Sequence, residues 1–281
     1  MQIIVAVNCV RPDSRAFSNQ AAISEAGSQP HNRSRLRSGL VLALLALILF
    51  GSISQPGKAQ SPYSPGGLFI HPTAFVPRAH QFSIYAAAFT QDQDNGVNES
   101  YYPLSLTYTP TDRLQVSGIL TYHLSKDDPP RIHPGAFVKY QLTPDSSRLP
   151  AFALAAGYSG NDWLETTVSG VASHTFRRSG RVLTTLHAGI KWGRQPDQVG
   201  GSDGFGAFLG AQVPLNRDWD LVGETSTRLK FDRSSAYSVG FMYHNRSGLG
   251  VSLALVDGGR SSRMKPFIGV GIPIGSLGRD R

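Results

Sequence analysis

The stretch "GLFIHPTAFVPRAHQFSIYAAAF", residues 67–89, decides how the rest of the chain is interpreted. Its second half alternates, because Phe82 and Ile84 fall on one side of an extended backbone and Ser83 falls on the other. One strand of this kind fits a soluble sheet as well as the wall of a membrane barrel. The two folds are separated by whether the alternation continues along the chain and by where the long loops fall.

The alternation continues almost to the C-terminus. About twelve segments, most of 8 to 13 residues, carry apolar side chains at every second position. The segments are residues 79–90, 100–110, 113–124, 135–142, 151–158, 164–176, 181–192, 205–215, 218–231, 236–243, 248–256 and 266–274. A strand that crosses a bilayer at a tilt needs about 9–11 residues, whereas strands of soluble proteins are typically nearer 5–6. The segment lengths therefore favour a membrane barrel.

The length of each connection depends on which segment it follows. Links after the first, third, seventh and eleventh segments are long and polar, as in "QDQDNGVNE" and "GRQPDQVGGSDG". Links after the second, sixth, eighth and tenth are tight, as in "PTD" and "NRD", while those after the fourth and fifth follow the rule less closely. Outer-membrane barrels have long external loops and short periplasmic turns, and their sheet must close because hydrocarbon leaves no partner for a free edge. We therefore predict an all-β fold, a transmembrane antiparallel β-barrel of about 12 strands (10–14), in the outer membrane of a Gram-negative-type bacterium.

The N-terminal region has the three parts of a secretory signal peptide. Basic residues lie at 33–37, an apolar core spans 40–53, and Gly57-Lys58-Ala59 places small residues where a signal peptidase acts. The apolar core has 14 residues, fewer than the about 20 of a spanning helix, which favours cleavage before Gln60 over a permanent anchor.

We accordingly divide the chain into a leader at 1–59, a periplasmic lead-in at 60–78 and the barrel at 79–281. Pro72 and Pro77 lack the backbone N–H that a central strand needs. The lead-in is therefore expected to be extended but outside the wall, either in the periplasm or in the mouth of the lumen.

Charge and cysteine content exclude several functions. The formal net charge is +8, of which residues 1–59 contribute +4, and the remaining basic residues form no stripe, so nucleic acid is not an expected partner. Cys9 is the single cysteine, which rules out an intrachain disulfide and a cysteine-based metal cluster. The histidines lack metal-ligand spacing. We expect neither a metal nor a cofactor.

If the apolar faces point to lipid, the other faces line the lumen. By this parity the lumen-facing candidates are Lys139, Glu165, His187, Lys191, Asp220, Glu224, Arg228 and Lys230. Glu224 and Arg228 share a face but lie about 13 Å apart along a strand, so we expect Glu224 to pair with a cation on the seventh, eighth or tenth segment. These residues would form either a structural ion-pair network or a selective, ligand-coordinating constriction.

A barrel enzyme is the main alternative. Some outer-membrane barrels hydrolyse lipids with a histidine and a serine on the outer face, and the nearest match here is His244 with Ser247. That spacing puts the two side chains on opposite faces of a strand, so we expect no enzymatic activity. A soluble secreted β-barrel or β-sandwich that binds a ligand is the other alternative.

One short motif resembles a known family. Gly67, Leu68, Pro72, Thr73 and Ala74 match an element that precedes the first strand of YjbH-type outer-membrane barrels, and "DLVGETS" at 220–226 is similar to an inward-facing glutamate segment of such barrels. The family is linked to exopolysaccharide production and export, and no catalytic residue carries over. The resemblance implies a passive pore or an envelope component for exopolysaccharide binding and assembly. The expected partners are outer-membrane lipid, the barrel-assembly machinery and envelope polysaccharide.

Overall fold

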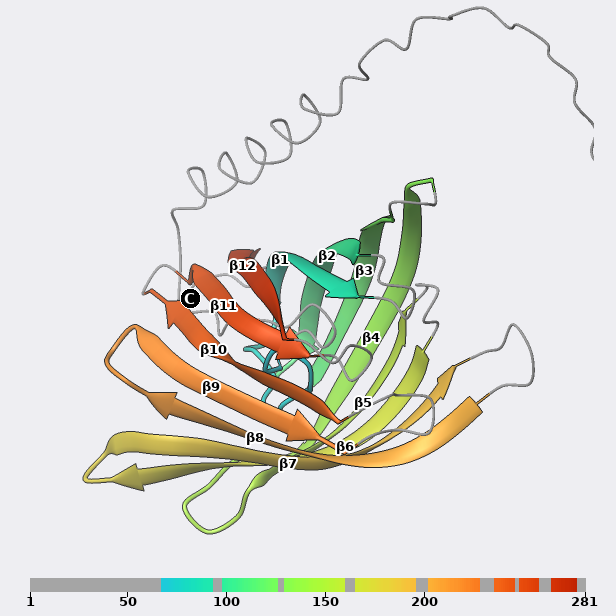
Figure 1. Ribbon diagram of the computed structural model, residues 1–281. Coiled ribbons are helices and arrows are strands. Elements are labelled where there is room, and N and C mark those ends of the chain that lie inside the picture. The colour runs from blue at the N-terminus through green and yellow to red at the C-terminus, as the bar shows by residue number, and fades with distance from the viewer. Residues whose placement is uncertain are drawn as a thin grey trace, which may run out of the picture. The chain divides into compact units, whose positions relative to one another are not determined.

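The computed structural model describes residues 67–92, 98–125, 129–159, 165–195, 202–227, 235–245, 248–257 and 264–276. The predicted leader at 1–59 lies outside these residues. Within them the chain forms twelve strands: β1 Gln81–Asp92, β2 Asn98–Thr111, β3 Leu114–Leu124, β4 Arg131–Thr143, β5 Ala151–Ser159, β6 Glu165–Arg178, β7 Arg181–Gln195, β8 Ser202–Pro214, β9 Trp219–Ser226, β10 Ala236–His244, β11 Gly250–Asp257 and β12 Lys265–Ser276. Each strand pairs antiparallel with its neighbours in the chain, and β1 pairs with β12, so the sheet closes (Figure 1). The predicted closed barrel of about twelve strands is confirmed. No helix in the described part of the chain is long and apolar enough to span a bilayer.

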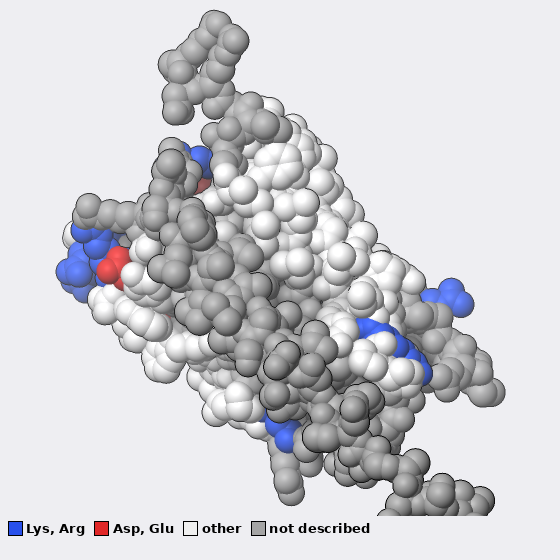
Figure 2. All heavy atoms as spheres, turned by 90° about the horizontal axis from the view of Figure 1, so that it is seen from above, with Lys and Arg blue, Asp and Glu red and all other residues white. Residues whose placement is uncertain are grey.

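The two faces of the wall have opposite polarity. On β2 the outward Leu104 and Leu106 are about half exposed (48% and 51%), whereas Ser105 and Thr107 between and beyond them are buried. This arrangement inverts that of a soluble protein, in which large apolar side chains are buried. Figure 2 shows a largely uncharged outer surface with Lys and Arg at its margins. The outer face is therefore suited to lipid, and the chain has the architecture of a transmembrane β-barrel.

Several strands extend further than the sequence predicts. β2 begins at Asn98, inside the stretch expected to be a loop, and β7 continues to Gln195. Backbone pairing in a hairpin continues past the apolar band because the ladder does not depend on side-chain polarity. The link between β6 and β7 is the two-residue turn Ser179-Gly180, whose φ angles of 50° and 79° are those of a tight hairpin turn.

β9 is shorter than expected. It ends at Ser226, whereas the sequence predicts a segment over 218–231, of which residues 228–231 lie outside the described chain.

The segment before β1 lies inside the ring of strands (Figure 1), and we call residues 67–78 the inner segment. Its Leu68 and Ala74 are essentially unexposed (1% and 0%). A bridge between Gly67 and Pro72, with the Leu68 N–H donating to the His71 carbonyl at 2.8 Å, closes its first residues into a compact loop. The structure places this described part of the lead-in inside the barrel, which is one of the two locations expected for it.

Candidate functional site

Six inward positions in register form the surface on which the inner segment lies. Successive strand pairs align one residue from each of β10, β9, β8, β7, β6 and β5: Ser238, Glu224, Gly210, His187, Ser173 and Ala151. We call these six residues the seat row. Their side chains are small or polar, so they leave room for a second layer of chain and offer it hydrogen-bond partners.

Glu224 holds the inner segment by its backbone and by one side chain. Its Oε1 accepts from the Ile70 N–H at 2.6 Å and from the Ser238 hydroxyl at 2.7 Å. Its Oε2 accepts from the His71 N–H at 3.0 Å and lies 2.9 Å from His71 Nδ1. A carboxylate is tolerated in a buried place only when its oxygens have such partners. The four contacts make Glu224 the central anchor of the inner segment.

The prediction that Glu224 pairs with a cation on a neighbouring strand is wrong. The sequence places a cation on the seventh, eighth or tenth segment, but the titratable side chain against Glu224 is His71, which lies outside the wall. The tenth segment supplies only the hydroxyl of Ser238. Strand parity cannot find this contact, because the inner segment has no strand register with the wall.

Two wall glycines make space for the inner segment. A Cβ on Gly210 would lie 2.2 Å from Leu68 Cδ1, so Leu68 occupies the place of a missing side chain. The His71 ring stacks on Phe208 with centroids 4.6 Å apart and planes at 15°. Phe208 in turn lies over Gly189, where a Cβ would come within 2.3 Å of its Cζ. The apolar contacts of the inner segment therefore depend on the absence of side chains at two positions of β7 and β8.

The far end of the inner segment is fixed on β6 and β7. The Ala74 N–H donates to Ser173 Oγ at 2.9 Å, and the same hydroxyl lies 2.8 Å from His187 Nδ1. The Phe75 ring meets His187 edge-on, with centroids 6.0 Å apart. His187, a predicted lumen residue, is thus part of the surface that holds the inner segment.

The other predicted lumen residues lie apart from the seat row. Lys139 is fully buried in β4, opposite Gln115 of β3. Lys191 is half-buried on β7. Asp220 is buried on β9, where its Oδ2 accepts from Gln212 Nε2 at 2.5 Å. Glu165 begins β6, but its side chain lies outside the described structure, as do Arg228 and Lys230.

The structure contains a second buried polar cluster, which the sequence patterns do not predict. Glu99 of β2 accepts a hydrogen bond from the Tyr101 hydroxyl, and its Oε1 lies 3.4 Å from His123 Nε2. The Tyr101 and His123 rings stack with centroids 4.6 Å apart and planes at 2°. The sequence assigns Glu99 to a loop, although it has the same parity as Tyr101 and the opposite parity to Leu104. Extending the alternation by one residue, from Ser100 to Glu99, would have placed it in the lumen.

Only one residue of the alternative hydrolase pair lies in the described part of the chain. His244 Nδ1 lies 3.6 Å from Asp220 Oδ2, while Ser247 is outside the described residues. Across the described ranges, no group of three or more His, Cys, Asp or Glu side chains is placed to hold a metal ion.

Fold and site together define a transmembrane β-barrel whose lumen holds a segment of its own chain. No family model matches the sequence, and no curated protein matches it. Among solved structures the chain is similar to the translocator domain of the autotransporter NalP from Neisseria meningitidis (TM-score 0.45, 11% identity, covering 85% of this chain and 97% of that one). It is also similar to a mutant of the Rh. blastica porin (TM-score 0.31, 12% identity, 69% and 98%) and to a mutant of the monoaromatic hydrocarbon channel TodX (TM-score 0.37, 11% identity, 71% and 90%).

Proposed function

We propose that the protein is an outer-membrane barrel that acts as a gated passive pore, closed by the inner segment and open when that segment leaves the lumen. The observation that carries this proposal is the set of four contacts that Glu224 makes beneath the inner segment. Side chains alone fill an eight-stranded barrel, and a barrel of twelve strands is wider. Removal of the inner segment would therefore leave a continuous aqueous path.

The seat row sets the chemistry of that path. Departure of the inner segment would uncover the hydroxyls of Ser173 and Ser238, the imidazole of His187 and the carboxylate of Glu224. These groups hydrogen-bond well to hydrophilic solutes and poorly to apolar ones. The class of solute that fits is small and polar.

Planar-bilayer conductance of the purified mature protein tests this function. We expect the wild type to be mostly closed and Glu224→Ala to raise the open probability by about tenfold or more, since each lost hydrogen bond to a charged group is worth about 1.5–3 kcal/mol. Asp203→Asn, at an exposed position on β8, is the matched control and should behave as wild type. A wild-type protein that conducts continuously, or a Glu224→Ala variant with unchanged current, would contradict the gate.

A role with exopolysaccharide is the second candidate. The observation that favours it is that all five positions resembling YjbH-type barrels belong to the inner segment. Gly67 and Pro72 close its loop, and Leu68, Thr73 and Ala74 are buried. The resemblance thus covers the part of the chain that closes the lumen. We propose that envelope polysaccharide is the material whose binding or passage this segment controls.

A strain lacking the protein tests the polysaccharide role. Extracellular polysaccharide should fall in that strain and return with the wild-type gene but not with a gene lacking residues 67–78. An unchanged amount of extracellular polysaccharide in the deletion strain would reject this candidate. The gated pore is tested separately by the conductance measurement.

Export is part of the same proposal. The mature protein should begin at Gln60, with the leader removed, and should fractionate with the outer membrane. N-terminal sequencing of the protein from that fraction checks both points, and recovery of the full-length chain in the soluble fraction would contradict them.

A further inference from the structure

The outward surface of the wall has a hollow of about 710 Å³ across β4 to β9, on the side that faces lipid. Strand register explains why it forms. Two adjacent outward rows cross this part of the sheet, the first Leu154, Gly170, Ile190 and Ala207 and the second Phe152, Ala172, Ala188 and Leu209. Small residues at both positions of β6 and at one position each of β7 and β8 leave a floor between the two bulky side chains of β5 and those of Ile190 and Leu209.

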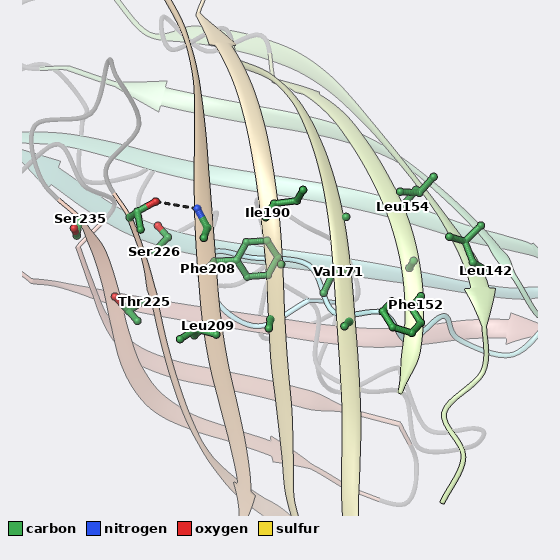
Figure 3. A pocket seen from close by; sticks show the side chains of 17 residues that line it. Leu142, Phe152, Leu154, Val171, Ile190, Phe208, Leu209, Thr225, Ser226 and Ser235 are labelled. Atoms are coloured by element: carbon green, nitrogen blue, oxygen red, sulfur yellow. Dashed lines mark hydrogen bonds between the residues drawn. The ribbon is translucent and has the colours of Figure 1, made fainter. Parts of the chain in front are cut away.

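The hollow changes in polarity from one side to the other. Phe152 and Leu154 stand at one side of it, and Thr225 and Ser235 at the other, as Figure 3 shows, while Ser226 lines it with a side chain that is buried on the inward face. None of the described side chains that line it carries a charge. Thr227 Oγ1 accepts a hydrogen bond from the Ala207 N–H at 2.9 Å, so its own proton can still be donated to a bound molecule.

We propose that this hollow is a binding site for one acyl chain of a membrane phospholipid, with the ester oxygens of that lipid at the hydroxyl side. The site is continuous with the outward apolar surface, on which Ile190 and Leu209 are more than 60% exposed. Because this surface faces the bilayer, the opening of the hollow is in contact with lipid acyl chains. The hydroxyls match the uncharged ester region of a phospholipid. The inference is independent of the gate.

Gly170 allows the hollow to be filled without disturbing the wall. A Cβ at this position would lie 3.9 Å from Leu154 Cδ2 and 4.0 Å from Ile190 Cγ1, which are ordinary contacts. Gly118 is also an outward glycine, on β3, and a Cβ there would meet nothing within 4 Å. Gly170→Leu therefore blocks the proposed site, and Gly118→Leu makes the same change elsewhere on the wall.

The test uses purified protein in vesicles of phosphatidylethanolamine, part of which carries a photoactivatable diazirine in its acyl chain. Mass spectrometry should locate the cross-links of wild type and Gly118→Leu mainly on β6 and β7, with about a tenfold loss in Gly170→Leu. Ala188→Leu fills the same floor from the next strand and should give the same loss. A heat-modifiable gel shift shows that each variant is folded.

Three results would overturn the site. The first is labelling spread evenly around the barrel, as expected of lipid that merely surrounds the protein. The second is unchanged labelling of β6 and β7 in both filling variants. The third is a dimer of the purified protein in which β6 and β7 escape lipid labelling, which would assign the hollow to a second copy of the chain.

Discussion

Glu224 Oε2 lies 3.0 Å from the backbone nitrogen of His71 and 2.9 Å from Nδ1 of the same residue, although 153 positions separate the two in the chain. A single carboxylate oxygen thus fixes both the backbone and the side chain of the inner segment. The other oxygen holds Ile70 N–H and the Ser238 hydroxyl. Because both ends of this contact are buried, its loss on either side should alter the whole segment.

Replacing His71 should loosen the inner segment less than replacing Glu224 does. His71→Ala removes the ring contact with Glu224 and the stacking on Phe208, but Glu224 still accepts the two backbone N–H groups. A cysteine introduced at Ala74, buried in the wild type, reports opening through its reaction with a thiol reagent that cannot cross membranes. We expect labelling to rise from wild type to His71→Ala to Glu224→Ala, and equal labelling of all three would show that this contact does not hold the segment.

Adding a side chain at Gly210 should expel the inner segment. A Cβ at this position would lie 2.2 Å from Leu68 Cδ1, so Gly210→Val should open the pore in bilayer recordings. Leu68→Ala removes the clashing methyl group, and the double variant should return toward the wild-type current. An opening in Gly210→Val that Leu68→Ala leaves unchanged would mean that the wall itself had been distorted.

Gly189 should tolerate no side chain. Its Cβ would come within 2.3 Å of Phe208 Cζ and 2.6 Å of the Gly170 carbonyl oxygen. Gly189→Ala should lower the free energy of unfolding by about 1–3 kcal/mol, the usual cost of overpacking. Urea unfolding from lipid vesicles measures this, with Gly118→Ala as a control that should cost much less. Phe208→Ala should restore only part of the loss because the carbonyl contact persists, and full restoration would show that the ring alone is responsible.

The turn between β6 and β7 should influence folding. Ser179 and Gly180 both have positive φ, a conformation that a β-branched residue adopts only at a cost. Gly180→Val should reduce the free energy of unfolding by about 1 kcal/mol or more, and Ser179→Asn should leave it equal or raise it. Folding into vesicles followed by the gel shift measures both. A neutral Gly180→Val would indicate that the turn rearranges freely.

The two faces of the wall could be predicted from sequence because period-two alternation determines which side chains meet lipid. The alternation places Phe82 and Ile84 on the opposite face from Ser83, and in the structure Ser83 is buried whereas Phe82 and Ile84 are half-buried. Strand ends were less accurate, as with Asn98, because apolar periodicity stops at the edge of the lipid-facing band while backbone pairing continues.

The contents of the lumen could be predicted only in part. Parity identifies Glu224 and His187 as inward residues, but it says nothing about a partner that belongs to no strand, such as His71. The sequence does not indicate that Gly210 makes room for Leu68, because a glycine in a strand can equally mark a bend. The contact with Leu68 appears only when the closed sheet brings residues of distant segments together.

The most direct measurement of the central claim is disulfide formation between Leu68→Cys and Gly210→Cys in isolated outer membranes. The single native cysteine, Cys9, lies in the predicted leader, so the two introduced thiols would be alone in the mature chain. We predict that a mild oxidant links them in most molecules and that the pair Leu68→Cys and Gly118→Cys, whose second member faces outward on β3, stays reduced. A folded, heat-modifiable barrel in which Leu68→Cys and Gly210→Cys fail to link would contradict the claim that the inner segment lies in the lumen.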